Sequence, residues 1–305
     1  MSAPPPPPSN DPSPLDQRTS SSLSSGLTYR AIKRAMAQQF AAADLPFADE
    51  DALDLLLGLS GLTHADYVMT GAAPVPAEHR QALNAATDRR LNGEPVDRIL
   101  GWRDFYGRRF AVDHVLSPRG DTEVLLLAAL TAIRDIKAPS LIDLGTGSGA
   151  LAVSLLCERP NATGLATDRD PAALRTARRN AKAHGVTDRL TFLQSDWFND
   201  LPARPVDAIL SNPPYITTAA MAALDREVSA HDPDGALHGG VDGLDPYRIL
   251  IPGARAFLRP EGWLGVEIGF DQGDAVRTLF LASGYRHVRI ILDPAGLDRV
   301  VCGQI

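Results

Sequence analysis

After Asp121 the chain alternates short apolar runs with longer segments of helical periodicity. Five runs have the length of buried strands: Ser140–Leu144, Gly164–Asp168, Leu190–Gln194, Val206–Ser211 and Gly262–Ile268. Helical segments separate the early runs, which predicts a parallel sheet covered on both faces. Two last runs, His287–Leu292 and Asp298–Gly303, flank a turn at Pro294-Ala295-Gly296 and predict a terminal antiparallel hairpin. The predicted fold class is therefore α/β, a doubly wound, mostly parallel sheet of seven strands.

Before this region, between Leu27 and Arg98, the apolar positions recur at helical spacing. One predicted helix face is formed by Ala31, Ile32, Ala35, Met36 and Phe40. Leucines between Leu53 and Leu59 mark a second helix, and a third runs from Ala77 to Leu91 and stops at Asn92-Gly93. The pattern predicts a small helical-bundle domain over residues 27–98, followed by an α/β domain over residues 121–305.

The segment between these domains, residues 99–120, has a different period. Phe105–Val112 predicts two short strands around a Gly-containing turn, a β-hairpin linker. Arginines give it a local positive excess: Arg98, Arg103, Arg108, Arg109 and Arg119. This excess is either a solvated face or a contact surface for an RNA-associated partner.

Residues 1–26 are rich in Pro and Ser. They carry too few apolar groups to offset the entropy of ordering, so we predict a disordered tail. A polyproline ligand for a partner is the alternative. Prolines also stand where a signal peptide would have a basic and then an apolar segment, and no apolar run reaches the roughly 18 residues of a membrane helix. We therefore expect a cytoplasmic protein without a membrane partner.

The charge balance argues against bulk nucleic-acid binding. The formal net charge is −7, the sequence pI is about 5.5, and residues 27–95 contain 6 Lys+Arg against 9 Asp+Glu. A protein held by phosphate contacts normally carries a basic face. No direct nucleic-acid partner is expected. The seven histidines are scattered, and Cys157 and Cys302 are predicted to be reduced structural thiols, so no metal site is expected either.

The strongest candidate for a cofactor site follows the first predicted strand. Asp143 and Leu144 lead into the glycine-rich turn Gly145-Thr146-Gly147-Ser148-Gly149, and a helix is predicted over Ala150–Cys157. Glycines let the backbone approach a ligand closely, and a helix N-terminus offers unpaired N–H groups. The spacing Gly145-x-Gly147-x-x-Ala150 also fits a dinucleotide-binding turn, so the loop alone leaves the cofactor open.

Acidic and aromatic residues follow the next two strands. Asp168 can accept hydrogen bonds from both hydroxyls of a ribose, although it could instead cap the helix beginning near Pro171, a role for which Asp170 is better placed. Asp196 and Trp197 can bind an adenine amino group and cover the ring, unless Trp197 is a core aromatic. Together the strand ends favour an adenosine-bearing cofactor in the crevice where doubly wound sheets bind ligands.

The fourth strand ends in Asn212-Pro213-Pro214-Tyr215, which separates the two cofactor classes because hydride transfer has no need of it. The lone pair of an amide or arylamine nitrogen is delocalised, so its N–H bonds must be held and the lone pair aimed. The Asn212 side-chain oxygen and the Pro213 carbonyl can each accept one hydrogen. Consecutive prolines fix the backbone, and the Tyr215 ring can pack against a planar acceptor. We predict transfer of a methyl group to such a nitrogen, with S-adenosylmethionine as cofactor.

The glycine loop and the Asn212–Tyr215 turn resemble those of the class I amino-methyltransferases, and within them the HemK-type peptide chain release factor glutamine methyltransferases. Further segments over residues 27–305 resemble that family: Glu94-Pro95-Val96, Ile99-Leu100-Gly101, Phe105-Tyr106-Gly107, Pro118–Glu123, Ser195–Phe198 and Ala236–Leu244. Gly120 stands where the family has proline, and Asp232 where it often has glutamate. Glu123 could be a simple first-turn helix acid.

This resemblance implies the class I methyltransferase fold and a set of site residues. S-adenosylmethionine would be bound by Asp143, Gly145, Thr146, Gly147, Ser148, Gly149, Asp168, Asp196, Trp197 and Asn212. The acceptor would be held by Asn212, Pro213, Pro214 and Tyr215, with Asn212, Pro213 and Tyr215 catalytic.

The acceptor implied by the family is the glutamine of the Gly-Gly-Gln motif of bacterial release factors, methylated on its side-chain N5. The helical domain would help to grip the release factor, and a monomer is expected. Three alternatives remain: a ribosomal-protein glutamine methyltransferase, a DNA adenine-N6 methyltransferase acting on a flipped base, and a binding module that retains the cofactor without catalysis. The acidic helical domain disfavours DNA, and the intact Asn212–Tyr215 turn disfavours the binding module.

Overall fold

The structure is a computed structural model that describes residues 27–223 and 233–305. It divides into two compact units, residues 1–92 and 93–305. The tail predicted at residues 1–26 lies outside the described residues, as does Asp232. No helix in the described part of the chain is long and apolar enough to cross a membrane.

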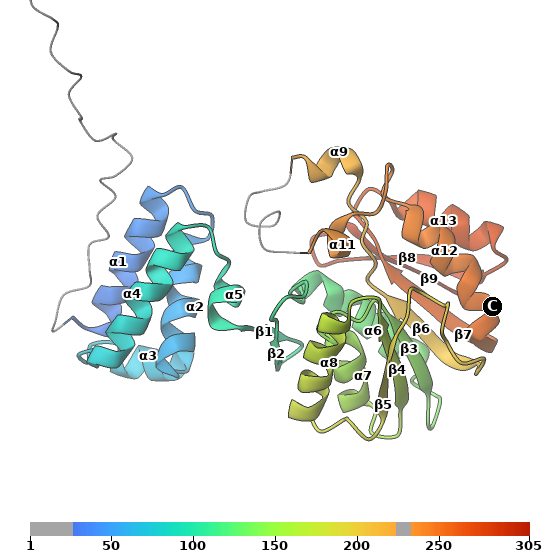
Figure 1. Cartoon of the computed structure of the whole chain (residues 1–305), viewed down its shortest axis with the longest axis horizontal. Helices are drawn as coiled ribbons and strands as arrows, with labels where there is room; N and C mark the ends of the chain where they lie inside the picture. Colours follow the sequence, from blue (N-terminus) through green and yellow to red (C-terminus); the bar gives the residue numbers. More distant parts are fainter. Residues whose placement is uncertain (1–26, 224–232) are drawn as a thin grey trace, which may run out of the picture. The chain divides into compact units, whose positions relative to one another are not determined.

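Within residues 27–92, the first unit is a bundle of four helices (Figure 1): α1 (Tyr29–Ala42), α2 (Ala48–Ser60), α3 (His64–Thr70) and α4 (Ala77–Leu91). The three predicted helices are confirmed, and their apolar faces supply a core that includes Ile32, Met36 and Phe40. α3 was not predicted, because it buries no residue and so shows no apolar stripe. It begins instead at a capping box between Thr63 and Asp66.

The second unit opens with α5 (Val96–Leu100) and a β-hairpin of β1 (Trp102–Phe105) and β2 (Arg108–Ala111). The hairpin was predicted, although β1 begins three residues before the predicted segment. Its two-residue turn, Tyr106-Gly107, has φ of 48° and 68°, as a tight hairpin turn requires. Asn180 of α8 (Pro171–Ala183) exchanges two hydrogen bonds with the Ala111 backbone, at 2.9 and 3.0 Å, and so ties the hairpin to α8.

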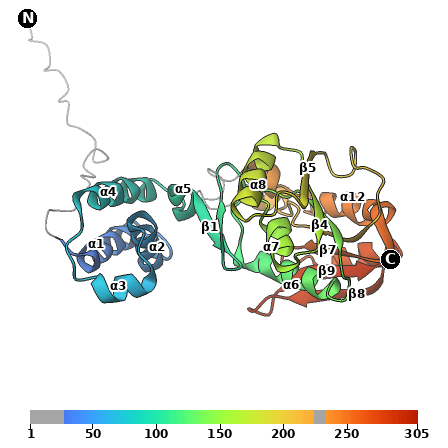
Figure 2. The ribbon, with the colours of Figure 1, turned by 90° about the horizontal axis from the view of Figure 1, so that it is seen from below.

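The main sheet has seven strands in the order β5-β4-β3-β6-β7-β9-β8 (Figures 1 and 2). The strands are β3 (Ser140–Leu144), β4 (Thr163–Asp168), β5 (Leu190–Gln194), β6 (Val206–Ser211), β7 (Leu258–Glu267), β8 (Arg286–Leu292) and β9 (Asp298–Gln304). β3 to β7 pair in parallel, and β9 is antiparallel to both β7 and β8. The predicted mostly parallel sheet with a terminal hairpin is confirmed.

Helices cover both faces of the sheet, as Figure 1 shows. One apolar core includes side chains from α6 (Glu123–Ala132) and α7 (Ala150–Glu158), and the other includes side chains from α12 (Asp245–Ala254) and α13 (Gly273–Ala282). Successive strand residues alternate between the two cores: Ala208 and Leu210 belong to the first, and Ile209 to the second. Short helical segments complete the unit: η2 (Gly120–Thr122), α9 (Thr218–Met221), α11 (Asp234–Leu237) and η3 (Arg255–Phe257).

Candidate active site

A cavity of about 260 Å³ lies at the carboxyl ends of β3, β4, β5 and β6. This is the edge where open parallel sheets bind ligands. Ten predicted site residues line it: Gly145, Thr146, Gly147, Ser148, Asp168, Asp196, Trp197, Asn212, Pro213 and Pro214. The structure therefore brings the two predicted motifs, the glycine loop and the Asn-Pro-Pro turn, to one cavity.

The glycine loop presents its backbone to this cavity. Gly145 and Gly147 have φ of 70° and 54°, a region that side chains disfavour. A Cβ atom at Gly147 would meet nothing within 4 Å, so the residue faces open space. The Gly147 N–H donates to Asp168 Oδ2 at 3.0 Å, which fixes the loop against the end of β4.

Asp143 and Gly149, both predicted to bind cofactor, do not line the cavity. Asp143 is buried beneath the loop, where its Oδ2 accepts hydrogen bonds from the Thr146 hydroxyl at 2.6 Å and the Ala152 N–H at 3.3 Å. Gly149 caps α7 with φ of 80°, and a Cβ there would lie 3.0 Å from that of Ala177. Both residues therefore support the loop without lining the cavity. Burial raises the pKa of Asp143 to about 6.

Asp168 places its carboxylate in the cavity wall. Its Oδ1 accepts the Asp170 N–H at 2.9 Å, and its Oδ2 accepts that of Gly147. Each carboxylate oxygen can accept more than one hydrogen bond, so both remain available to a pair of ligand hydroxyls. Burial raises the pKa of Asp168. The cap of α8 is Asp170, which accepts the Ala172 N–H at 2.7 Å, so Asp168 does not serve as that cap.

Trp197 lies between core and cavity. It is half-buried and packs against the α12–α13 core, yet it also lines the cavity beside Gly145. Its φ of 53° is a rare conformation for an aromatic residue, and such strain gathers at ligand sites. Asp196 beside it is exposed and lines the same wall. An aromatic face and an acceptor therefore meet at one end of the cavity.

Asn212 enters the cavity from the end of β6. Its Nδ2 donates to the hydroxyl of Thr122 at 3.3 Å. Because one end of the amide is engaged in this way, its other end, Oδ1, is left to accept a hydrogen bond. Thr122 also lines the cavity and had no role in the sequence prediction.

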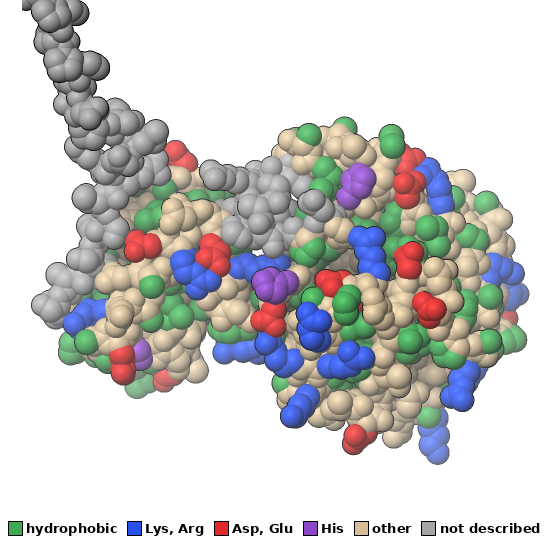
Figure 3. Space-filling model, in the orientation of Figure 1, with side chains coloured by type: hydrophobic (Ala, Val, Ile, Leu, Met, Phe, Trp, Pro, Cys, Tyr) green, Lys and Arg blue, Asp and Glu red, His purple; other side chains and the backbone are tan. Residues whose placement is uncertain are grey.

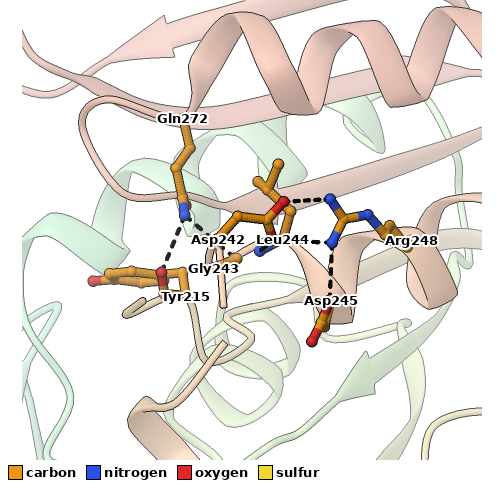
Figure 4. A network of polar contacts seen from close by, with 7 residues as sticks. All are labelled: Tyr215, Asp242, Gly243, Leu244, Asp245, Arg248 and Gln272. Carbon is orange, nitrogen blue, oxygen red and sulfur yellow. Dashed lines mark hydrogen bonds and ion pairs between the residues drawn. The ribbon is translucent and has the colours of Figure 1, made fainter. Parts of the chain in front are cut away.

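Tyr215, the last residue of the predicted turn, does not line the cavity. Its backbone is held from behind by Gln272, whose Nε2 donates to the carbonyls of Tyr215 at 3.0 Å and Gly243 at 3.2 Å (Figure 4). Gln272 Oε1 accepts the Gly269 N–H at 3.0 Å and the Tyr247 hydroxyl at 3.4 Å. Burial raises the pKa of the Tyr215 hydroxyl. Gln272 thus fixes the backbone of the turn, a role that was not predicted from the sequence.

The segment beside Tyr215 needs glycine for this packing. Gly243 has φ of 75°, and a Cβ there would lie 2.4 Å from the Tyr215 carbonyl oxygen. Arg248 clamps the same segment through hydrogen bonds to Asp242 and Asp245, at 2.9 and 2.8 Å (Figure 4). The hydrogen bonding of Arg248 to Asp242 lowers the pKa of that carboxyl to about 2.

A second residue missed from the sequence is Glu267, at the carboxyl end of β7. Its side chain is buried, and its Oε2 finds no hydrogen-bond partner among the described residues. Burial raises its pKa to about 7, although the Thr122 hydroxyl and Arg299 oppose the shift. A carboxylate in the otherwise apolar run Gly262–Ile268 was the signal in the sequence that could have identified it.

The segment between the hairpin and α6 forms another wall, with His114, Val115, Leu116, Ser117 and Pro118 lining the cavity. The guanidinium of Arg98 donates to the backbone carbonyls of Val112, Asp113 and Val115 and so shapes this segment. Glu123 accepts the Tyr106 N–H at 2.8 Å, so it joins α6 to the hairpin turn and is more than a first-turn acid.

Gly120, which departs from the family pattern, is exposed, and a Cβ there would meet open space. Nothing in its surroundings therefore requires glycine. α11 brings Gly235 and Ala236 to the remaining wall of the cavity.

Basic side chains gather on the surface of the second unit around α8 and the hairpin (Figure 3). The exposed residues of α8 include Arg175, Arg178, Arg179 and Lys182, and the helix contains no acidic residue. Other arginines of the hairpin are used within the fold: Arg108 pairs with Glu158 at 2.6 Å, and the Arg109 guanidinium lies 3.3 Å from the Trp102 ring centroid. The local charge of this surface is opposite in sign to that of the whole chain.

Comparisons with known proteins agree with this geometry. Residues 121–229 match the family described as methyltransferase small domain, and residues 31–101 match the PrmC N-terminal domain. Among solved structures, the hMettl16 catalytic domain in complex with the MAT2A 3'UTR hairpin 6 has a TM-score of 0.53 at 12% identity, over 74% of this chain and 81% of that one. At this identity the likeness shows the fold alone, and the predicted class I methyltransferase fold is confirmed.

Two relatives extend over most of the chain. The release factor glutamine methyltransferase of Cereibacter sphaeroides is 45% identical over 273 residues, which cover 89% of this chain and 96% of that protein. The protein of the same name from Agrobacterium fabrum is 41% identical over 256 residues, covering 82% and 88%. With this identity along nearly the whole length of both proteins, the chain is a methyltransferase and belongs to the release factor glutamine methyltransferase family.

Proposed function

We propose that the chain transfers a methyl group from S-adenosylmethionine to the side-chain N5 of the glutamine in the Gly-Gly-Gln motif of bacterial release factors. The observation that carries the proposal is the cavity that Gly145–Ser148 and Asp168 share with Asn212–Pro214. A cofactor loop and a pair of hydrogen-bond acceptors thereby face the same space, in a chain of the release factor glutamine methyltransferase family.

The residues present fit S-adenosylmethionine. The cavity is near the roughly 300 Å³ at the lower end of small-molecule sites. Asp168 offers carboxylate oxygens to the ribose hydroxyls, and Trp197 offers a ring face to the adenine. Gly145 and Gly147 leave room for close approach of the methionine part. When bound, the cofactor supplies an electrophilic methyl group on a sulfonium.

Asn212 and Pro213 would hold the two N–H bonds of the acceptor amide. The Asn212 Oδ1 is free to accept, since its Nδ2 already donates to Thr122. Holding both hydrogens keeps the nitrogen in place and aims its lone pair, and such near-attack placement supplies about 7–11 kcal/mol. No general base is needed before attack, because the methylated nitrogen becomes strongly acidic and loses its proton to water.

The substrate is tested with labelled S-adenosylmethionine and three acceptors: a purified release factor, ribosomal protein and DNA. We expect label only in the release factor, and none when the glutamine of its Gly-Gly-Gln motif is replaced by alanine. Label confined to ribosomal protein or DNA would reject the assignment. DNA is included because the basic surface of α8 weakens the argument from net charge.

The role of the turn is tested with Asn212→Ala. We expect kcat to fall by about 10²-fold or more, while the Kd of S-adenosylhomocysteine, measured by calorimetry, changes little. Asn199→Ala is the matched control, since Asn199 is exposed and does not line the cavity. Wild-type kcat for Asn212→Ala would contradict the mechanism.

A further inference from the structure

Arg169 connects the end of β4 to α11. It directly follows Asp168, and its Nη2 donates to the Gly235 carbonyl of α11 at 2.9 Å. Gln194, at the end of β5, holds the Arg169 backbone by donating to its carbonyl at 3.1 Å. Arg169 and Gly235 both line the cavity. One exposed side chain therefore ties the strand ends to the short helix that forms another wall of the cavity.

The other end of α11 is attached to the acceptor turn. The carbonyl of Leu237, the last residue of α11, accepts the Ile216 N–H at 2.9 Å, and the Ile216 carbonyl accepts the Gly239 N–H at 2.8 Å. Ile216 directly follows Tyr215, so these bonds fix the helix to the segment that ends the turn. α11 thus joins the two halves of the proposed site, with backbone hydrogen bonds at one end and Arg169 at the other.

The contact with Arg169 depends on the missing side chain at residue 235. A Cβ atom at Gly235 would lie 2.0 Å from Arg169 Nη2 and 3.1 Å from its Cζ. The φ of Gly235 lies outside the left-handed region, so the backbone conformation does not itself call for glycine. The glycine therefore makes room for the guanidinium to reach the backbone of the helix.

The attachment through Arg169 is the part of this wall that can open. Its hydrogen bond is exposed, and exposed contacts open more readily than buried ones. Pro233, Gly235 and Ala236 line the cavity and would move with the helix. We propose that Arg169 is a positioning residue that holds α11 as a lid over the cofactor cavity, and that this hydrogen bond opens when cofactor enters or product leaves. The inference rests on the proposed function for the identity of the ligand, but the contact itself belongs to this fold.

A lid held by the protein itself has a particular kinetic signature. Both partners of the hydrogen bond belong to the protein, so it forms with or without ligand. Weakening it raises the open fraction of the free and the bound protein alike, and kon and koff rise together. Loss of a direct contact between Arg169 and the ligand would instead raise koff alone. The two rate constants therefore distinguish a lid from a ligand contact.

The kinetic test uses Arg169→Met, which has a side chain of similar shape but no donor. Stopped-flow binding of S-adenosylhomocysteine, followed by tryptophan fluorescence, gives both rate constants, with Trp197 in the cavity wall as the reporter. We expect kon and koff each to rise about 3- to 10-fold, as loss of one hydrogen bond allows, while Kd changes by less than about twofold. A rise in koff with unchanged kon, or wild-type values of both, would overturn the inference.

Gly235→Ala tests the same contact without removing a charge. The added methyl group displaces the guanidinium, so this variant should raise kon and koff as Arg169→Met does. The double variant should be no faster than the faster single variant, because both changes break one hydrogen bond. An effect of Arg169→Met that Gly235→Ala does not reproduce would assign it to the lost charge and contradict the lid.

Two matched controls should keep the wild-type rates. Gly120→Ala places a Cβ in open space, and like Gly235 the residue has φ outside the left-handed region. Arg175→Met removes an exposed arginine of α8 that does not line the cavity. Equal acceleration in these controls would show that the rates do not report on the contact between Arg169 and α11, and would overturn the inference.

A measurement without ligand separates this inference from the proposed function. The backbone amides of residues 235–239 should exchange hydrogen faster in Arg169→Met and Gly235→Ala than in the wild type, and at the wild-type rate in Arg175→Met. Unchanged exchange in both variants would overturn the inference. Faster exchange in a protein that leaves release factor unlabelled would support the attachment of α11 by Arg169 and reject the substrate.

Discussion

Gln272→Leu should separate the support of the acceptor turn from its chemistry. The leucine has nearly the size of glutamine but no polar atoms, so three backbone groups lose a partner: the carbonyls of Tyr215 and Gly243 and the N–H of Gly269. Leaving a buried backbone group unpaired costs about 1–3 kcal/mol. The free energy of unfolding should therefore fall by about 3–5 kcal/mol, in the range reserved for broken buried networks.

Function should suffer as well, because Tyr215 is then free to shift. A displacement of about 1 Å at the reacting groups can lower kcat about 10²-fold. Gln272 does not line the cavity, so the Kd of S-adenosylhomocysteine should be retained in the folded variant. Loss of kcat with retained cofactor affinity would place the effect at the acceptor turn.

Urea denaturation monitored by circular dichroism measures the change in stability, with the shift of the midpoint interpreted at unchanged m-value. The control is Gln194→Leu in the same unit, since the side chain of exposed Gln194 donates to the Arg169 carbonyl at 3.1 Å and lies away from the turn. That variant should lose less than about 1 kcal/mol. A Gln272→Leu protein no less stable than this control would refute the conclusion that Gln272 stabilises the backbone of the turn.

Two further predictions concern the loop and the buried carboxylate. Gly147→Ala should weaken binding of S-adenosylhomocysteine, measured by calorimetry, at least about 10-fold. The control is Gly185→Ala, at a similar φ of 69° and equally free of clashes, which should lose stability but keep its affinity for S-adenosylhomocysteine. Equal affinities of the two variants would contradict close approach of the ligand at Gly147. The folded-state pKa of Glu267, about 7, lies above its ordinary 4.5, so the protonated form is the more compatible with folding and stability is lost as pH rises. Relative to Glu267→Gln, the wild type should lose about 3 kcal/mol of unfolding free energy between pH 4 and pH 8, and a constant difference between their stability curves would exclude this linkage.

Much of the fold could be predicted from the sequence because the local pattern of apolar residues matches the burial that each element has in the folded protein. Ser140–Leu144, Leu190–Gln194 and Val206–Ser211 are strands with the predicted bounds. Each is a short apolar run that ends at a polar residue or turn, and burial on both faces explains the lack of alternation. α3 escaped prediction because it packs no residue fully, so its sequence lacks the apolar stripe that marks a helix.

The candidate site was predictable where the backbone conformation requires particular residue types. Examples are the spaced glycines from Gly145 to Gly149 and the paired prolines. Its supports were not predictable in this way. Glu267 and Gln272 come near the turn through the pairing of β6 with β7 and the loop after β7, and Thr122 meets it from η2. Each contact joins segments that are distant in the chain. Sequence spacing carries no record of such contacts.

The two ends of the parallel strands differ in a way that indicates where the chemistry lies. At the amino ends, burial tends to raise the pKa of Asp207, but hydrogen bonds from Ser140 and Arg259, at 2.7 and 2.6 Å, outweigh it and lower the pKa. At the carboxyl ends, Asp143 and Glu267 are more deeply buried, and each keeps one oxygen without a partner in the described part of the chain.

Stability alone would favour the first arrangement, since a buried carboxylate is tolerable when its oxygens are paired. The second arrangement loses folding free energy and leaves acidic groups with raised pKa values beside a cavity. Groups of this kind gather at functional sites because hydrogen bonding and charge there serve a ligand rather than the core. The acidic residues beneath the glycine loop and behind the Asn212–Tyr215 turn are therefore best explained by the reaction, and the apolar packing on both faces of the sheet is what allows the fold to retain them.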